Sequence, residues 1–167
     1  LDGLKILDCS QILAGSFCSM ILGDMGAKVN KKEKPNGGDD IRTWGPFING
    51  ESVGFMNLNR NKESIVIDFK NPEGIKIMKR LVENSDVVLE NYRTGTMEKL
   101  GLGYEELKTI NKKIIYCSIS GFGRTGPYSK KAFSFLSTPW SIEPRNHICP
   151  SLNSLDNVLT IGVGLHS

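Results

Sequence analysis

Short apolar runs alternate with amphipathic stretches along the first two thirds of the chain. Four of these runs are short enough to be strands, which they predict at residues 4–8, 64–69, 86–90 and 114–119. A further extended segment is expected to begin at Lys28. The third run, Asp-Val-Val-Leu-Glu, is apolar at each central position, as in a strand that is buried on both faces of a sheet.

Helical spacing of apolar residues appears between these runs. Residues 14–26 predict a helix that ends at Gly26, because glycine suits the left-handed position after a helix. Asn71 followed by Pro72 predicts the start of a second helix, with an N-cap residue and then a proline in the first position. One or two short helices are expected over residues 94–111. Residues 41–61, between the extended segment that begins at Lys28 and the strand predicted at residues 64–69, are mixed and contain glycine, so we expect this stretch to be irregular.

The order strand, helix, strand, helix, strand predicts an α/β fold with a Rossmann-like parallel sheet and flanking helices. Ligands of such sheets bind at the carboxyl ends of the strands. The composition changes near residue 133, because the remaining residues hold one of the 21 Lys and Arg and two of the 18 Asp and Glu. We therefore divide the chain into a Rossmann-like region, residues 1–132, and a divergent C-terminal tail, residues 133–167, for which irregular structure is expected.

Composition and charge narrow the classes of function. The chain has 167 residues, 39% of them hydrophobic, and a net charge of +3, which by itself does not indicate nucleic-acid binding. No apolar run approaches the roughly 20 residues that span a bilayer, so no membrane segment is expected. The four cysteines form no C-x-x-C pair and both histidines lie near the C-terminus, so neither a metal site nor a disulfide framework is expected. Reduced thiols in an intracellular compartment are the simpler interpretation.

Basic and polar residues cluster next to the predicted strands, where a phosphate-bearing cofactor would need cations and helix-start amides. These candidates are Lys31, Lys32, Lys34, Arg60, Lys62, Lys70, Asn91, Tyr92, Arg93 and Lys99. Solvated surface charges are the alternative, and spacing alone favours that alternative.

Candidate nucleophiles and carboxylate catalysts are few. The carboxylates are Asp8, Asp39, Asp40 and Asp68, and turn capping is the default role for the Asp39–Asp40 pair. Cys9 lies at a strand end, but no histidine occurs in the first 146 residues to activate it, which favours a structural cysteine. The G-x-G-x-x-G letters at residues 121–126 follow a strand but open no helix, which indicates a turn and not a dinucleotide site.

Nine segments, taken in order, resemble the family III CoA-transferases, which include formyl-CoA and carnitine-CoA transferases. They are residues 1–8, 13–15, 22–29, 33–35, 38–40, 59–65, 71–74, 86–92 and 118–123. Within the family the chain is most similar to the mitochondrial succinate–hydroxymethylglutarate CoA-transferase group. The α-methylacyl-CoA racemases are related, but they generally have a shorter stretch between the acidic loop and the strand that here lies at residues 64–69. The long stretch at residues 41–60 favours a transferase.

The resemblance implies a Rossmann-like large domain, a small domain and an interlocked homodimer that acts on acyl-CoA and a small carboxylic acid without a metal. It also implies a mitochondrial location, although no targeting segment is visible. CoA would lie across the strand ends. The residues that match the family's CoA contacts are Leu13, Ala14, Lys34, Ile67, Lys70, Asn91, Tyr92, Arg93 and Lys99. In the family an aspartate attacks the acyl-CoA thioester and carries the acyl group and then CoA.

The resemblance stops after Ala132, and the family's nucleophilic aspartate has no counterpart beyond it. Asp156 is the only later aspartate, and neither its context nor its spacing matches. We therefore assign no catalytic residue and expect a truncated CoA-transferase family member, moving CoA from succinyl-CoA to a dicarboxylic acid when complete and inactive as this chain. The alternatives are a non-catalytic CoA-binding or dimer-partner fragment, an unstable translation product, and a racemase relative.

Overall fold

The computed structural model of the chain describes residues 1–121, 123–125, 127, 129 and 158–162. Its six-stranded sheet has the order β5-β2-β1-β6-β7-β8, and all neighbouring strands are parallel. The strands are β1 (Lys5–Asp8), β2 (Lys28–Glu33), β5 (Lys62–Val66), β6 (Val87–Glu90), β7 (Ile115–Ser120) and β8 (Val158–Gly162). The predicted Rossmann-like α/β class is therefore confirmed.

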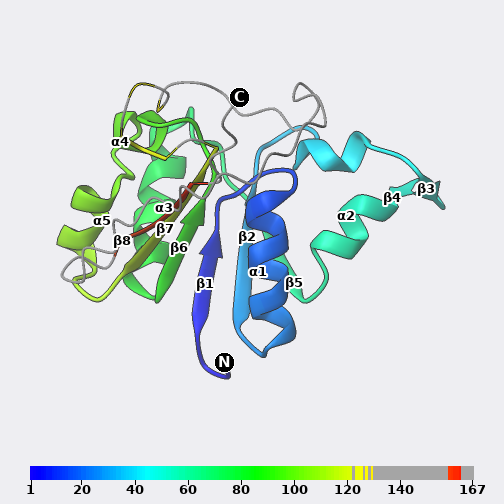
Figure 1. Ribbon diagram of the computed structural model, residues 1–167, viewed down its shortest axis with the longest axis horizontal. Helices are drawn as coiled ribbons and strands as arrows, with labels where there is room; N and C mark the ends of the chain where they lie inside the picture. Colours follow the sequence, from blue (N-terminus) through cyan, green and yellow to red (C-terminus); the bar gives the residue numbers. More distant parts are fainter. Residues whose placement is uncertain (122, 126, 128, 130–157, 163–167) are drawn as a thin grey trace.

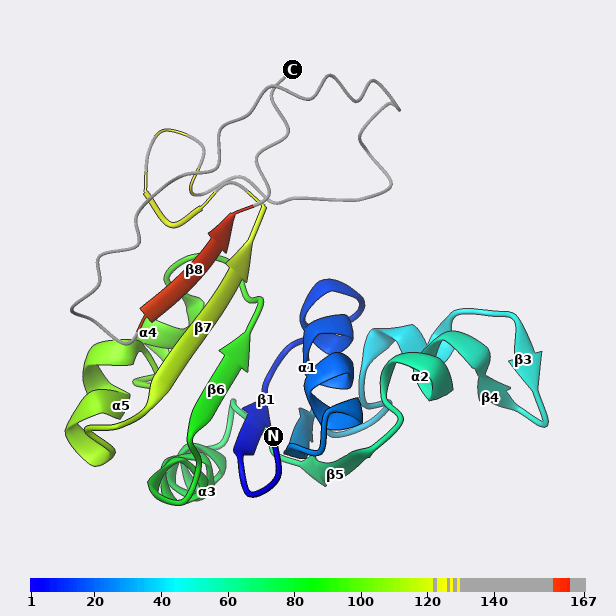
Figure 2. The ribbon, with the colours of Figure 1, turned by 60° about the horizontal axis from the view of Figure 1, so that its bottom comes forward.

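Helices cover both faces of the sheet (Figure 1, Figure 2). On one face lies α1 (Ala14–Asp24), which contacts β1, β2 and β6. The opposite face carries α3 (Pro72–Glu83), α4 (Thr96–Lys99) and α5 (Tyr104–Ile110). The central strand β6 is buried at every position, as its uninterrupted apolar run predicted.

The larger apolar cluster lies between the sheet and the α3–α5 layer. It joins Leu7, Val88 and Tyr116 of the strands to Met78 of α3 and Leu107 of α5, and each of these side chains is at most 1% exposed. Full burial of one such side chain stabilises the fold by about 1.5–3 kcal/mol. A smaller cluster lies between the sheet and α1. The two clusters hold the strand ends in fixed relative positions.

The prediction of irregular structure over residues 41–61 is wrong. This stretch forms an arm that extends from the sheet between β2 and β5 (Figure 1). Its elements are η1 (Asp40–Thr43), β3 (Phe47–Ile48), β4 (Glu51–Ser52) and α2 (Val53–Leu58). Each is too short to show a hydrophobic period. Two helix caps stabilise them: the Asp39 side chain accepts a hydrogen bond from the Ile41 amide, and the Ser52 side chain accepts one from the Phe55 amide. An apolar cluster that includes Met20 of α1 also holds the arm.

Capping signals predicted the helix ends correctly, and strand ends less well. The Asn71 side chain accepts a hydrogen bond from the Glu73 amide, and Gly26 has a φ of 95° after α1. The strand predicted at residues 64–69 instead spans Lys62–Val66, because Asp68 accepts a hydrogen bond from the Lys70 amide and turns the chain. The strand at residues 114–119 was expected to be the last, but β8 pairs with it in parallel.

We predict that Gly74→Ala destabilises the chain by about 2 kcal/mol or more. An added Cβ would lie 2.1 Å from the Asp68 carbonyl oxygen, so the backbone before α3 would have to move. Gly54→Ala is the matched control near the start of a helix, because its Cβ would meet nothing closer than 3.5 Å. That control should change the free energy of unfolding by at most about 1 kcal/mol, toward greater stability. Urea denaturation measures both, and equal stabilities would contradict the prediction.

Candidate functional site

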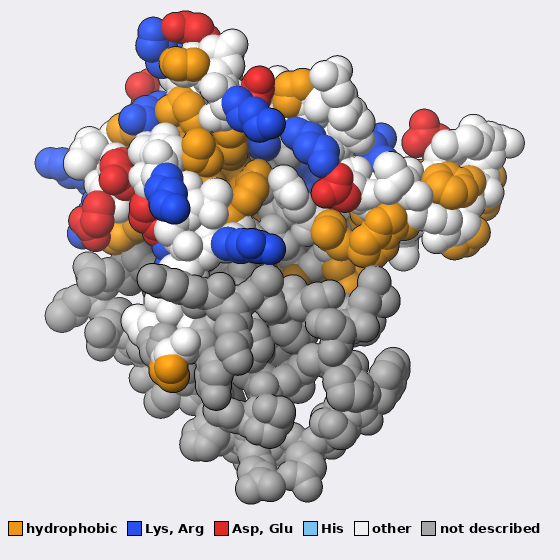
Figure 3. Space-filling model, turned by 90° about the horizontal axis from the view of Figure 1, so that it is seen from above, with side chains coloured by type: hydrophobic (Ala, Val, Ile, Leu, Met, Phe, Trp, Pro, Cys, Tyr) orange, Lys and Arg blue, Asp and Glu red, His pale blue; other side chains and the backbone are white. Residues whose placement is uncertain are grey.

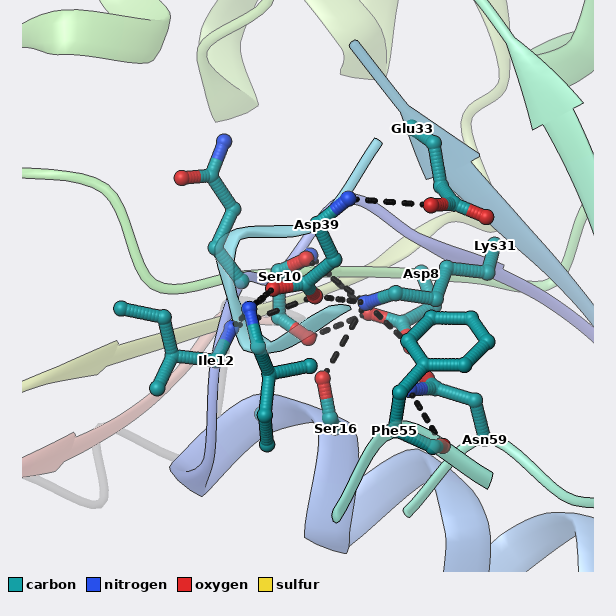
Figure 4. A network of polar contacts seen from close by, with 12 residues as sticks. Asp8, Ser10, Ile12, Ser16, Lys31, Glu33, Asp39, Phe55 and Asn59 are labelled. Atoms are coloured by element: carbon teal, nitrogen blue, oxygen red, sulfur yellow. Dashed lines mark hydrogen bonds and ion pairs between the residues drawn. The ribbon is translucent and has the colours of Figure 1, made fainter. Parts of the chain in front are cut away.

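A buried ion network lies where the carboxyl ends of β1 and β2 meet the start of α1 (Figure 4). It consists of Asp8, Lys31, Asp39 and Lys62, whose side chains are each at most 1% exposed. The Lys31 ammonium lies at its centre, 2.9 Å from Asp39 Oδ2 and 3.9 Å from Asp8 Oδ2. It also donates to the Ser10 carbonyl oxygen at 3.0 Å and to Ser16 Oγ at 3.1 Å.

Asp8 connects this network to the first turns of α1 and to β5. One carboxylate oxygen accepts from the Ser10 amide at 2.9 Å and the Ser10 hydroxyl at 2.5 Å. The other accepts from Ser19 Oγ at 2.6 Å and from Lys62 Nζ at 3.2 Å. Burial lowers the pKa of Lys62 to about 8, although the Asp8 carboxylate opposes this shift. With two acids and two bases, the formal charges of the network cancel.

Asp39 connects this network to the loop before α1, because its carboxylate binds both Lys31 and the backbone of that loop. Its carboxylate accepts from the Ile12 amide at 3.0 Å, and Ile12 has a φ of 63°. The helix then begins after Leu13 without a side-chain cap. At Gly15 an added Cβ would lie 2.2 Å from Ser10 Cβ, so only glycine lets α1 approach the loop after β1 this closely. The first amides of α1 are thus presented, uncapped by a side chain, at the carboxyl edge of the sheet.

A second charged cluster supports the end of β2 from the arm. The Arg42 guanidinium donates to both carboxylate oxygens of Glu33, at 2.7 and 2.8 Å, and Ser64 Oγ donates to one of them at 2.6 Å. With the Asp39 amide as a further donor, these bonds lower the pKa of Glu33 to about 2, against the effect of burial. Gly38, with a φ of 66°, has no room for a Cβ beside Glu33.

The loop after β6 is fixed to the loop after β1. Asn91 Oδ1 accepts from the Gln11 amide, and Asn91 Nδ2 donates to the Gln11 carbonyl oxygen, both at 2.8 Å. The Tyr92 hydroxyl accepts from Gln11 Nε2 at 3.2 Å. Below this loop, burial raises the pKa of Glu90, whose carboxylate accepts from the Tyr92 amide at 2.7 Å and from Arg124 at 3.1 Å.

Three of the four basic residues predicted to bind the cofactor are exposed. Seen from the carboxyl ends of the strands, Lys and Arg side chains gather on the described surface (Figure 3). Lys70, Arg93 and Lys99 are exposed there, and no ion pair or hydrogen bond of their side chains is found within the described part of the chain. Lys34 is half-buried and pairs with Asp40.

The remaining predicted residues differ in exposure. Leu13 and Ala14 are exposed at the start of α1, and Asn91 and Tyr92 are partly buried in their loop. Ile67 is 3% exposed, so side chain and backbone together offer almost no surface to a ligand in this structure.

Several basic residues that the sequence placed next to strand ends have structural roles. Lys31 and Lys62 belong to the buried ion network. Arg60 pairs with Asp24 at the far end of α1, away from the carboxyl edge. Asp39 is the N-cap of η1, as the turn-capping interpretation predicted.

Sequence reasoning missed three residues that shape the site, namely Gln11, Arg42 and Arg124. Gln11 and Arg42 gave no signal in the sequence, because each acts through partners distant along the chain. Arg124 lies in the G-x-G-x-x-G segment, which we interpreted from its glycines as a turn, and its partner Glu90 is distant along the chain.

In the described part of this edge, several of the side chains that could act as nucleophiles or as general acids and bases are buried or held in ion pairs. The carboxylates of Asp8, Glu33 and Asp39 are all held in ion pairs. Cys9 is fully buried, and this burial raises the pKa of its thiol well above the usual range, which fits the structural role predicted for it. Within the described residues, no three His, Cys, Asp or Glu side chains converge as metal ligands. None of the helices described is both long and apolar enough to cross a bilayer.

Comparison with known proteins gives consistent matches. Residues 1–134 match CoA-transferase family III. The chain is 52% identical over 133 residues to human succinyl-CoA:glutarate CoA-transferase, covering 79% of this chain and 30% of that protein. It is 47% identical over 136 residues to succinate–glutarate CoA-transferase of Agrobacterium fabrum, covering 77% and 34%.

A crystal structure of a CAIB/BAIF family protein from Brucella suis is also similar, with a TM-score of 0.74 and 48% sequence identity. The match covers 78% of this chain and 36% of that one. The chain thus spans about a third of the length of these relatives. The family inferred from the ordered motifs is confirmed.

We predict that Glu33 makes stability depend on pH in the acid range. Arg42 above all, and then Ser64, hold the pKa of Glu33 at about 2 in the folded chain, against 4.5 as its ordinary value. The stabilisation is therefore complete above pH 4.5 and is lost as the pH falls toward 2. Glu33→Gln should flatten the free energy of unfolding across this interval, as measured by urea denaturation at each pH.

Glu73→Gln is the control, because Glu73 lies exposed on α3 and its one ion-pair partner among the described residues is Lys76 in the same helix. This variant should keep the pH dependence of the parent chain. An unchanged slope in Glu33→Gln would contradict the role assigned to the Arg42–Glu33 pair.

Proposed function

Because the chain belongs to CoA-transferase family III, we propose that residues 1–132 form the CoA-binding region of an enzyme that moves CoA between an acyl-CoA and a carboxylic acid. The names of the human and Agrobacterium relatives point to succinyl-CoA as the donor and a dicarboxylic acid as the acceptor. Relatives that act with citramalate or oxalate show that acceptors vary within the family. The acceptor is therefore proposed only as a class.

The observation that carries this proposal is the combination, at one edge of the sheet, of helix amides without a side-chain cap and cations without an ion-pair partner among the described residues. The start of α1 presents backbone N–H groups with no side-chain cap. Lys70, Arg93 and Lys99 bring positive charge to the same edge from the ends of β5, β6 and α4. The phosphates of CoA need both kinds of donor, and the fixed backbone here requires little reorganisation to provide them.

The remaining predicted residues complete the proposed CoA site. Leu13 and Ala14 would provide apolar and backbone contacts at the start of α1, and the buried Ile67 would support the adenine side from beneath. Asn91 and Tyr92, fixed by their bonds to Gln11, would contact the pantetheine arm. Lys34 would contribute to the adenosine phosphates after exchanging its partner Asp40 for the ligand. Lysine in place of arginine keeps the charge but loses bidentate geometry.

We further propose that this chain binds CoA but does not by itself transfer it. The attack on the thioester needs a carboxylate nucleophile, and none of the aspartates of the sequence matches the family's position after residue 132. A non-catalytic CoA-binding or dimer-partner role is the second candidate, and the same observation favours it. An interlocked homodimer and a mitochondrial location remain proposals that rest on the family.

We expect the chain to bind CoA in calorimetry, and Lys70→Ala and Arg93→Ala each to weaken that binding. Loss of one charge-assisted phosphate contact should lower the affinity about tenfold. Lys113→Ala removes an exposed lysine before β7, at the opposite end of the strands, and should leave the affinity unchanged. No binding of CoA by the folded chain would contradict the proposed function, and equal losses in all three variants would contradict this placement of the site.

We expect no CoA transfer from succinyl-CoA to glutarate by the isolated chain. The reaction can be followed as formation of glutaryl-CoA by chromatography. Should transfer occur, Asp156→Ala distinguishes two explanations. Loss of turnover in that variant would make Asp156 the nucleophile, whereas turnover that survives would place the reactive group elsewhere and contradict our interpretation of residues 133–167.

A further inference from the structure

Lys31 and Lys32 are adjacent in β2, but among the residues that the structure describes only Lys31 has a carboxylate partner. Lys31 faces α1 and lies 2.9 Å from Asp39. Lys32 points to the opposite face, and its residue is 5% exposed. Its ammonium lies 3.9 Å from the centroid of the Phe69 ring and 3.5 Å from the Tyr92 hydroxyl. Within the described part of the chain, no carboxylate lies at ion-pair distance from it.

A buried ammonium without a counter-ion is unfavourable for folding. An aromatic face and one long hydrogen bond satisfy only part of its three donors. An apolar residue normally occupies a core position of this kind. Ile65, the residue that pairs with Lys32 on the neighbouring strand β5, is an example. The contacts of the Lys32 ammonium with the described residues do not offset the cost of burying its charge. An anion bound nearby would provide the missing counter-charge.

The surroundings of Lys32 identify the kind of anion. Phe69 and Tyr92 lie next to each other against the larger apolar cluster, with ring centroids 6.3 Å apart, and both are partly exposed. Phe69 directly precedes Lys70, and Tyr92 directly precedes Arg93, the two exposed cations of the proposed CoA site. A ligand that meets aromatic rings and several cations together is a nucleotide phosphate.

We propose that Lys32 is a further phosphate-binding residue of the CoA site and contacts a phosphate of the adenosine end of CoA from beneath Phe69 and Tyr92. This inference rests on the proposed function and adds to it a residue that the family motifs did not point to. CoA offers a pyrophosphate and a ribose phosphate, and their shared chemistry fits Lys32 equally. Comparison of CoA with 3′-dephospho-CoA, which lacks the ribose phosphate, distinguishes the two phosphate groups.

The proposal implies that CoA binding takes up a proton at alkaline pH. Burial lowers the pKa of Lys32 in the free chain, and Lys31 and Lys34 add to this shift while Cys9 and Asp68 oppose it. A bound phosphate raises the pKa again, so a fraction of the lysine is protonated on binding. The affinity for CoA should therefore fall as the pH rises, and the measured heat of binding should depend on the ionisation enthalpy of the buffer.

The experiment is calorimetry of CoA and of 3′-dephospho-CoA with the parent chain, Lys32→Met and Lys28→Met, in two buffers at alkaline pH. Lys32→Met replaces an unpaired buried cation by an apolar chain of similar length, so its folding should not suffer. Lys28→Met is the matched control, because Lys28 is an exposed residue of the same strand and pairs with Glu63. Thermal unfolding confirms that both variants are folded.

We expect Lys32→Met to weaken CoA binding about tenfold or more and to lose the buffer-dependent heat, while Lys28→Met changes neither. An equal loss with 3′-dephospho-CoA would identify the pyrophosphate as the partner, and a loss confined to CoA would identify the ribose phosphate. CoA binding by Lys32→Met at parental affinity would overturn this inference while leaving the proposed function intact. Failure of the parent chain to bind CoA would overturn both.

Discussion

The ion pair between Lys31 and Asp39 is the interaction on which the geometry of the carboxyl edge depends. The two charged groups lie 2.9 Å apart and both side chains are 1% exposed. Such a buried pair offsets the cost of desolvation only if its remaining donors and acceptors are also hydrogen-bonded. Here the Ser10 carbonyl oxygen, the Ser16 hydroxyl and the Ile12 amide complete it. The pair therefore holds the end of β1, the end of β2 and the start of α1 in one arrangement, and the helix amides are aimed before any ligand arrives.

This arrangement separates charges that hold the fold from charges that are available to a ligand. The aspartates and lysines of the buried network neutralise one another, and Arg42 does the same for Glu33. Cations without a carboxylate partner in the described part of the chain remain at the rim, among them Lys70 and Arg93. The described part of this edge therefore offers cations and helix amides that suit an anion, in keeping with the CoA-binding role that we propose for it.

Local signals in the sequence predicted most of the fold. The cap at Asn71, the left-handed Gly26 and the apolar run of β6 each act within a few residues, and each was confirmed. The arm over residues 41–61 was not predicted, because its stability depends on contact with Met20 of a distant helix. Lysines show the same limit more sharply. Lys31 and Lys32 are one residue type at adjacent positions, but their environments differ because successive side chains of a strand point to opposite faces.

Binding of CoA across the carboxyl edge that the buried ion network shapes can be tested by titrating the isotope-labelled chain with CoA and following the amide chemical shifts. We expect the largest changes at residues 11–16, 70 and 91–93, with residues 25–27 and 84–86 at the opposite edge unaffected. Changes centred on those opposite-edge residues, or on the arm alone, would contradict it.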